Sequence, residues 1–202
     1  MNTKHENERV VKYIGKKQKR NTKFEELCKM RQFKVKEYCE RELKKQDYSV
    51  YKGEGYLLGV PTTSKGATFK TMLVAHMDTV HEVQPKKFIY TSTGVTSSQG
   101  IGGDDRCGVY AILEIIRTHK SIVLFTEDEE IGCVGANKFL ETEYAEIIKG
   151  NLLYIIELDR RGTDDAVFYD CGNEDFVKFV TEDEYFKKAY GSCSDISYLA
   201  PT

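Results

Sequence analysis

The stretch LVAHMDTV, residues 73–80, indicates the fold because an apolar segment runs directly into a histidine and an acid. Residues 71–75 (TMLVA) have the short, continuous apolar pattern of a buried strand. His76 and Asp78 follow it, separated by one residue, so in an extended chain both side chains face the same side. Asp78 can then hold the His76 ring through one nitrogen and leave the other free for a metal.

Three other segments also place acids after a strand or at the start of a helix. GIGGDDRCGVYAIL (residues 100–113) puts Asp104 and Asp105 at a helix start, while IVLFTEDEEIG (122–132) and LLYIIELDRRG (152–162) are strands that run into acids. Each cluster alone is typical of a solvated turn. One parallel sheet would bring the strand ends to one edge, where so many carboxylates need cations between them. The acids after the two strands are Glu127, Asp128, Glu129, Glu130, Glu157 and Asp159.

Strands alternate with helices along the chain, which predicts an α/β three-layer sandwich with a mainly parallel sheet and helices on both faces. The segments at 121–125 and 151–158 read as buried strands, and the one at 167–169 as an edge strand. The expected helices are 21–46, 105–117, 134–144, 174–180 and 183–190. The expected strands are 48–51, 56–60, 71–75, 88–90, 121–125, 151–158 and 167–169.

The composition favours a globular protein without a nucleic-acid or membrane partner. The chain has 202 residues and a net charge of −2, which gives no global attraction to nucleic acid or anionic lipid. It has no signal-peptide core, and no apolar run approaches the roughly 20 residues of a membrane span. The six cysteines form no CxxC pair, which favours free thiols in a reducing cytoplasm.

Five motifs between residues 70 and 200 carry a resemblance to a known clan. They are HMDTV (76–80), GGDDRCG (102–108), TEDEEIGCVGA (126–136), ELDRRG (157–162) and GSCSDI (191–196). In this order they resemble the co-catalytic di-zinc exopeptidases, which include peptidase T, carboxypeptidase G2-like enzymes and bacterial aminopeptidases. The resemblance implies an aminopeptidase or tripeptidase that hydrolyses a terminal bond of a peptide or acyl-amino-acid substrate.

The resemblance also implies a metal-ligand set. His76 and Asp159 are expected to bind a first Zn²⁺, Glu130 a second, and Asp104 both. Because histidine and carboxylate ligands also suit other divalent ions, Mn²⁺ and Co²⁺ are alternatives. In this clan the peptide after the bridging acid is often cis, which here is the bond between Asp104 and Asp105.

Four residues are expected to act beside the metals. Glu129 is the expected general base, which takes a proton from water and delivers it to the leaving amine. Asp78 is expected to orient His76. Asp195 resembles part of a loop that lines the substrate pocket, with a helix or turn cap as the equal alternative. Arg106 is expected to be a helix-surface or supporting charge, with substrate carboxylate binding as the lesser alternative.

The clan's later histidine on the second metal has no counterpart after GSCSDI. Apart from His76, His81 is the one histidine expected at the correct edge of the sheet, and a surface position suits it better. We therefore expect a chain cut short before its last ligand, or a chain complemented by another polypeptide, with one bound metal as the alternative to the clan's two. The short segment between Asp159 and GSCSDI leaves no room for a lid domain. The histidines are His5, His76, His81 and His119.

These expectations define two regions and three functions. Residues 1–20 are expected to form a polar, basic, partly disordered arm, and residues 21–202 a zinc-exopeptidase-like domain without its last strands. The favoured function is a metal-dependent exopeptidase. A catalytically impaired remnant or assembly subunit of the same fold is the alternative, and nucleic-acid binding through the arm is the least favoured.

Overall fold

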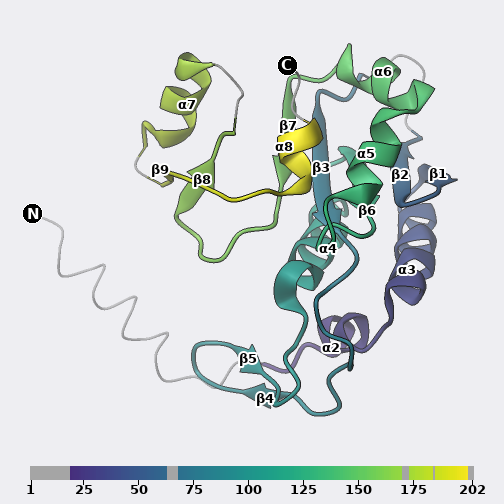
Figure 1. The fold of residues 1–202 in the computed structure, drawn as a ribbon, viewed down its shortest axis with the longest axis vertical. Helices are drawn as coiled ribbons and strands as arrows, with labels where there is room; N and C mark the ends of the chain where they lie inside the picture. The colour runs from purple at the N-terminus through teal and green to yellow at the C-terminus, as the bar shows by residue number, and fades with distance from the viewer. Residues whose placement is uncertain (1–18, 63–67, 170–172, 184, 200–202) are drawn as a thin grey trace, which may run out of the picture.

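A five-stranded sheet forms the centre of the computed structural model, which describes residues 19–62, 68–169, 173–183 and 185–199 (Figure 1). Residues 1–18 of the expected arm lie outside the described residues. The strand order is β1-β2-β6-β3-β7. These strands are β1 Tyr48–Gly53, β2 Tyr56–Pro61, β3 Thr71–His76, β6 Ile122–Thr126 and β7 Tyr154–Glu157.

The sheet is mainly parallel, as the sequence predicts. β3 lies between β6 and β7 and is parallel to both. β2 is antiparallel to β6 and to β1, so β2 alone opposes the direction of the other four strands. The strands predicted at 48–51 and 56–60 thus form as an antiparallel pair, β1 and β2, which extends the parallel strands on one side.

Helices cover both faces of this sheet (Figure 1). Leu73 and Ala75 of β3 pack into one core with buried residues of α2, α3 and α4. Met72 and Val74 point to the other face, into a second core with α5, α6 and α8. This alternation is the period of two that a strand imposes, and it confirms the three-layer arrangement. The helices are α2 Thr22–Cys28, α3 Gln32–Lys45, α4 Gly103–Ile115, α5 Val134–Leu140, α6 Glu143–Lys149, α7 Glu174–Thr181 and α8 Asp195–Leu199.

Two predicted helices are each divided in the structure. The segment 21–46 forms α2, capped by the Asn21 side chain, and α3, with an extended residue, Arg31, between them. The carbonyl of Met30 in this break accepts a hydrogen bond from the buried Arg106 side chain at 3.3 Å. The segment 134–144 forms α5 and the start of α6. The hydrogen bond that satisfies the backbone at the break between α2 and α3 comes from a residue far away in sequence. The spacing of apolar residues within the segment 21–46 therefore cannot reveal the break.

The strand predicted at 151–158 forms as β7 over Tyr154–Glu157, but it lies at the sheet edge, so the prediction that it is buried is wrong. Tyr154 is 39% exposed and Ile156 is 43% exposed. Among the described residues, β7 pairs with β3 on one side, and no strand lies along the other side of β7. Phe176 of α7 stacks on Tyr154 with ring centroids 5.4 Å apart, which covers this edge in part.

Residues after β7 form a small unit beside the main sheet. β8 (Asp165–Val167) pairs in parallel with β9 (Lys187–Ala189), and α7 joins them. The predicted edge strand at 167–169 thus lies two residues earlier, and the predicted helix at 183–190 is wrong. A helix of eight residues would be only marginally stable by itself. Pairing with β8 instead satisfies the backbone hydrogen bonds of the strand β9 in this segment.

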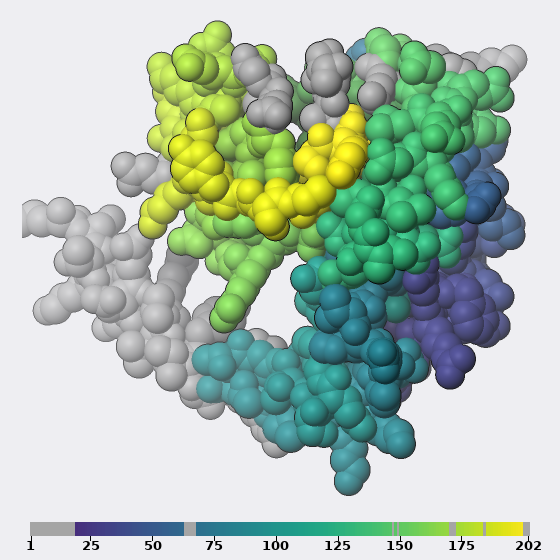
Figure 2. Space-filling model, viewed as in Figure 1, coloured from purple at the N-terminus to yellow at the C-terminus, as the bar shows by residue number. Residues whose placement is uncertain are grey.

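Two further features complete the described chain. A two-stranded hairpin, β4 (Ile89–Tyr90) with β5 (Val95–Thr96), projects beneath the sheet in Figure 1. Figure 2 shows the last described segment running from the β8–α7–β9 unit onto the α5–α6 layer. No helix in the described part of the chain is long and apolar enough to cross a membrane.

Candidate metal centre

The acids expected to meet do lie at one edge of the sheet, where the parallel strands end. His76 is the last residue of β3, and it pairs in register with Thr126, the last residue of β6. The turn after β6 carries Glu129 and Glu130, and Asp159 lies two residues beyond the end of β7. This is the carboxyl edge, where open α/β sheets form their sites.

The His76 ring is the centre of the cluster and is fully buried. Its Nδ1 atom lies 3.1 Å from Asp78 Oδ1, and its Nε2 atom lies 3.1 Å from Asp104 Oδ1. The same Nε2 atom is 3.8 Å from a carboxylate oxygen of Asp159 and 3.8 Å from one of Glu129. Asp78 therefore holds one ring nitrogen while the other faces several carboxylates.

Asp78 also fixes the turn after β6. Its Oδ1 accepts a hydrogen bond from the backbone N–H of Glu129 at 3.2 Å, and its Oδ2 accepts one from that of Glu130 at 3.1 Å. One carboxylate thus sets the positions of His76 and of both glutamates. Asp128 in the same turn is engaged elsewhere, because Gln32 donates to its Oδ1 at 3.0 Å.

Two overlapping groups of side chains have the geometry to hold a metal ion. One comprises His76, Asp104 and Asp159, and the other comprises His76, Glu129 and Glu130, with ligand atoms within 4.8 Å of one another in each. An imidazole nitrogen with carboxylate oxygens is a donor set that suits Zn²⁺. The Asp104 side chain is 72% exposed, so the group that contains it opens to solvent on that side.

The start of α4 brings Asp104 into this cluster. Asp104 and Asp105 have non-helical backbone angles, and the peptide bond between them is cis, as the resemblance implies. Asp105 is buried and its Oδ1 accepts from the backbone N–H of Gly108 at 2.8 Å, which caps the helix. Asp105 therefore stabilises the start of α4, while the Asp104 side chain extends toward His76.

Ser194 and Glu157 are site residues that the sequence reasoning did not assign. The Ser194 hydroxyl lies 2.7 Å from Glu157 Oε2 and 3.1 Å from Asp159 Oδ2. The backbone N–H of Ile196 donates to the same oxygen of Glu157 at 3.0 Å. The spacing of Glu157 and Asp159 was a usable signal, because residues two apart face the same side. The contact with Ser194 joins segments far apart in sequence and had no such signal.

Hydrogen bonding determines the charge of the buried histidine. Burial lowers the pKa of His76, but its hydrogen bonds to Asp104 and Asp78 outweigh burial and raise that pKa to about 11. The hydrogen bond to His76 lowers the pKa of Asp104 in turn. In the absence of a cation, a proton on His76 balances part of the negative charge.

Crowding and burial have the opposite effect on the other carboxyls. Burial raises the pKa of Glu129 to about 7, against an opposing effect of His76, and raises that of Glu157 to about 8. Burial also raises the pKa of Asp159 and, strongly, that of Asp105. Acids held in their neutral form so close together are the expected signature of a site built for cations.

The two expected substrate contacts differ in their surroundings. Asp195, the first residue of α8, is fully buried and accepts a short hydrogen bond from Thr126 through Oδ2, while its Oδ1 has no hydrogen-bond partner among the described residues. Burial raises the pKa of Asp195 to about 6. Arg106 is 1% exposed and its side chain donates to the Met30 carbonyl, so the expectation of a helix-surface charge is wrong, and the geometry favours a supporting role inside the fold over substrate contact.

The remaining described histidines lie outside the cluster. The ring of His81 lies against Gly100, where an added Cβ would be 2.4 Å from His81 Nε2. Neither metal-ligand group among the described residues includes His81. His119 is exposed beside Thr118, before the start of β6 and thus at the opposite edge of the sheet.

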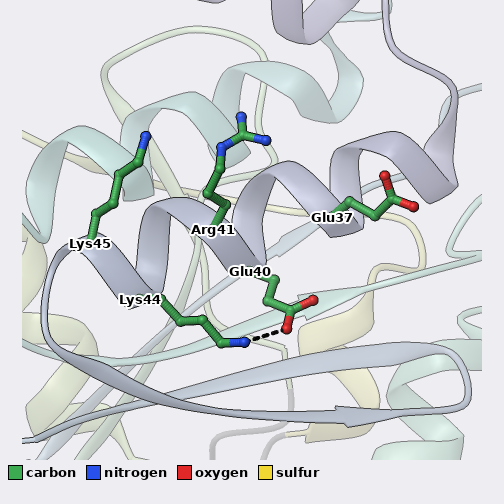
Figure 3. Close-up of a pocket in the computed structure, with 5 residues that line it drawn as sticks. All are labelled: Glu37, Glu40, Arg41, Lys44 and Lys45. Atoms are coloured by element: carbon green, nitrogen blue, oxygen red, sulfur yellow. Dashed lines mark hydrogen bonds and ion pairs between the residues drawn. The ribbon is translucent and has the colours of Figure 1, made fainter.

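A shallow hollow on the outer face of α3 is unrelated to this site (Figure 3). Lys44 and Glu40, one helical turn apart, form an ion pair of 2.7 Å there. Such alternating charges on an exposed helix are typical of a solvated surface. The lining residues are Glu37, Glu40, Arg41, Lys44 and Lys45.

Comparison with known sequences gives one family match. The profile of peptidase family M28 matches residues 60–195, which span β3, β6, β7 and every candidate ligand. A comparison with curated protein sequences gives no significant match.

Several solved structures share the fold. Aminopeptidase PepT from Bacillus cereus is 22% identical with a TM-score of 0.58, and a tripeptidase from Staphylococcus aureus is 20% identical with a TM-score of 0.57. They cover 72% and 71% of this chain, and the chain spans 44% of each of them. An aminopeptidase from the archaeon Desulfurococcus kamchatkensis is 15% identical with a TM-score of 0.51, and 93% of this chain and 82% of that one are covered. At these identities the similarity concerns the fold alone.

Proposed function

The chain belongs to peptidase family M28, and on that premise we propose that it is a zinc-dependent exopeptidase of the aminopeptidase or tripeptidase type. The observation that carries this proposal is the convergence on His76 Nε2 of carboxylates from three separate segments. A structural role does not explain that convergence, because it places like charges together in a largely buried place.

The first group, His76, Asp104 and Asp159, would hold one cation. Glu130 of the second group would hold the other together with Asp104, a pairing that the resemblance to the di-zinc exopeptidases implies. Nitrogen and oxygen donors of this kind fit Zn²⁺, with Mn²⁺ and Co²⁺ as alternatives. Asp78 would keep the His76 tautomer that leaves Nε2 unprotonated and able to bind.

A side chain of this protein would transfer the proton from the attacking water to the leaving amine. Bound divalent cations supply Lewis acidity, which polarises the scissile carbonyl and lowers the pKa of water. Glu129, whose pKa lies near 7, is poised to accept a proton from the attacking water through its carboxylate and to return it to the leaving amine. The hydrogen bond from its backbone N–H to Asp78 would hold Glu129 in position.

The second cation and the substrate complete the proposed function. The second group has no further histidine among the described residues, so a ligand from another polypeptide is part of the proposal. A chain that binds one cation and does not turn over substrate is the alternative. Peptides or acyl-amino acids would be the substrates. The five described cysteines are free thiols, which supports a reducing, cytoplasmic location.

The test counts bound zinc in the purified chain and in two matched variants. Asp104→Asn removes a ligand charge, whereas Asp128→Asn removes a neighbouring charge that faces Gln32. We expect the wild-type chain and Asp128→Asn to bind zinc and Asp104→Asn to lose most of it. Amino-acid release from short peptides should accompany zinc and stop with a chelator. A correctly folded wild-type chain that binds no zinc would contradict the proposal.

A further inference from the structure

Two cysteines from different parts of the chain meet beside the candidate general base. Cys133 directly precedes α5 and Cys193 lies two residues before α8, and they are 60 residues apart in sequence. Their sulfur atoms are 3.8 Å apart. Cys133 is buried, with its sulfur 3.8 Å from Glu129 Oε1, whereas Cys193 is exposed.

The other described thiols do not share this arrangement. Cys28 and Cys39 are buried near the opposite face of the sheet, and Cys107 is exposed in the first turn of α4. Within the described residues, no other two sulfur atoms are in hydrogen-bond contact. The pair of Cys133 and Cys193 therefore stands apart in having one accessible sulfur and one protected sulfur in contact.

We propose that Cys133 and Cys193 form a reversible disulfide, which links the start of α5 to the segment that carries Ser194. A disulfide needs the sulfur atoms about 2 Å apart. The distance of 3.8 Å between the two sulfur atoms therefore has to shorten to about that value. The exposed Cys193 side chain is free to make that rotation. The Cys193 sulfur lies 3.7 and 3.8 Å from the hydroxyls of Ser197 and Tyr198, and its thiol donates to the Tyr198 hydroxyl.

A peroxide is the class of oxidant that the exposed thiol would meet. The Cys193 thiol loses its proton as its sulfur attacks one peroxide oxygen, and the O–O bond breaks; the departing hydroxide takes that proton, so a sulfenic acid and one water form. The Cys133 sulfur then attacks the Cys193 sulfur, and the S–O bond breaks. The Cys133 proton leaves with the departing hydroxide as a second water. Two thiols are thereby oxidised by two electrons, which reduce one peroxide to two waters.

The disulfide would change two contacts of the candidate centre, that of Ser194 with Asp159 and that of Cys133 with Glu129. Ser194 follows Cys193 directly and contacts Asp159, so the disulfide would fix that contact from the α5 side. The oxidised Cys133 would have no proton to share with Glu129. These consequences rest on the proposed function, whereas formation of the disulfide does not.

The link is tested on the full chain treated with hydrogen peroxide and then digested without reduction. We expect the intact protein to lose the mass of two hydrogen atoms, a cross-linked peptide that joins Cys133 to Cys193, and full reversal by a dithiol. The oxidised chain should also melt several degrees higher, because the link closes a long loop. Cys193→Ser and Cys133→Ser should abolish the cross-link and the shift, and Cys107→Ser should keep both.

Several results would overturn the inference. These are oxidation of Cys193 beyond the sulfenic acid without a cross-link, a link from Cys193 to Cys107, or a shift in melting that persists in Cys193→Ser. Because Cys193 is exposed, its serine variant is expected to fold even if the buried Cys133→Ser does not. A cross-link in a chain that binds no zinc would uphold this inference while contradicting the proposed function.

Discussion

Glu129 and Glu130 are neighbours in sequence, yet their carboxyl groups have different surroundings. The Glu129 side chain is 12% exposed, and burial raises its pKa to about 7. Its oxygens lie near His76 and the Cys133 sulfur. Burial raises the pKa of Glu130 as well, and the nearby charge of Asp104 adds to that effect. One acid is thus poised to exchange protons, and the other faces the charge that a second cation would balance.

Glu129→Gln should separate catalysis from metal binding. Because the amide keeps the shape of Glu129 but cannot accept the proton of water, we expect kcat to fall about 10²- to 10⁴-fold. Zinc content should stay near that of the wild-type chain. Peptide hydrolysis and metal analysis on the same preparation measure both quantities. Asp128→Asn is the matched control, and loss of zinc together with activity in Glu129→Gln would make Glu129 a ligand.

Ser194→Ala should weaken metal binding from a position that touches no metal. The hydroxyl fixes Asp159 Oδ2, so that Oδ1 faces His76. Partners of this kind typically change metal affinity by about 10- to 100-fold, and we expect a loss in that range. A competition titration with a chelator measures it. The neighbouring, exposed Ser192→Ala should leave the affinity unchanged, and an equal loss in both variants would mean that the loop matters only as a whole.

The sequence identifies the residues of the cluster better than it identifies their supports. His76, Asp104, Glu129 and Asp159 each end or follow a strand or open a helix, and the geometry of parallel strands is enough to bring them together. The contact of Ser194 with Asp159 depends on where the chain returns after the β8–α7–β9 unit. No local pattern encodes that return, so the supporting residue is visible only in the structure.

At the scale of elements, α5 approaches the sheet closely through Gly135. A Cβ at Gly135 would lie 2.2 Å from the carbonyl oxygen of Gly55 and 2.5 Å from that of Glu127. Gly55 belongs to the turn between β1 and β2, and Glu127 directly follows β6. The absence of a side chain thus lets α5 sit against the strand end that leads into the Glu129 turn.

Gly135→Ala should therefore destabilise the fold through backbone displacement. The atoms it would meet belong to the main chain and cannot rotate away, so we expect a loss of about 2 kcal/mol or more in the free energy of unfolding. Denaturant titration followed by circular dichroism measures this loss. Gly150→Ala is the control, because its nearest contact is 3.6 Å and its change should stay within about 0.5 kcal/mol. Equal midpoints for the two variants would contradict the close approach of α5.

Element types follow from local patterns only where tertiary contacts agree with them. β3 and β6 are continuous apolar runs buried on both faces, as predicted. β7 has the same apolar pattern but lies at the edge, because a strand's place in the sheet depends on its neighbours and not on its own residues. The residues at 183–190 read as a helix, yet they contain β9, since β8 offers a pairing partner.

At the scale of the whole molecule, the fold concentrates negative charge where its strands end. The net charge is only −2, so this concentration comes from arrangement and not from composition. β3, β6 and β7 each deliver acids to one edge, and α4 and α8 add Asp104 and Asp195. Protons or cations have to balance these groups, which couples the stability of the molecule to pH and to divalent metal.

Without metal, the folded chain should lose stability as the pH rises from 5 to 8. Glu129, Glu157 and Asp195 have folded pKa values of about 7, 8 and 6, above their ordinary values of 4.5, 4.5 and 3.8. An acid with a raised folded pKa adds stability below its ordinary pKa and loses that stability as the pH passes its folded pKa. The raised pKa of His76, about 11, acts in the same direction above pH 6.5. Asp78 and Asp104, whose pKa values are lowered, stay ionised across this range and do not offset the loss.

Zinc should reverse this loss, because it replaces the protons that hold the cluster together. In a chelator, we expect the melting temperature to be lower at pH 8 than at pH 5 by roughly 5 °C or more. Excess zinc should raise it strongly at pH 8 and little at pH 5, where protons compete for the same oxygens. Differential scanning calorimetry at both pH values, with and without zinc, measures the four temperatures. Equal stabilisation by zinc at the two pH values would mean that protons and cations do not share a site, and the Asp104→Asn variant should show this weak pH dependence of the zinc effect.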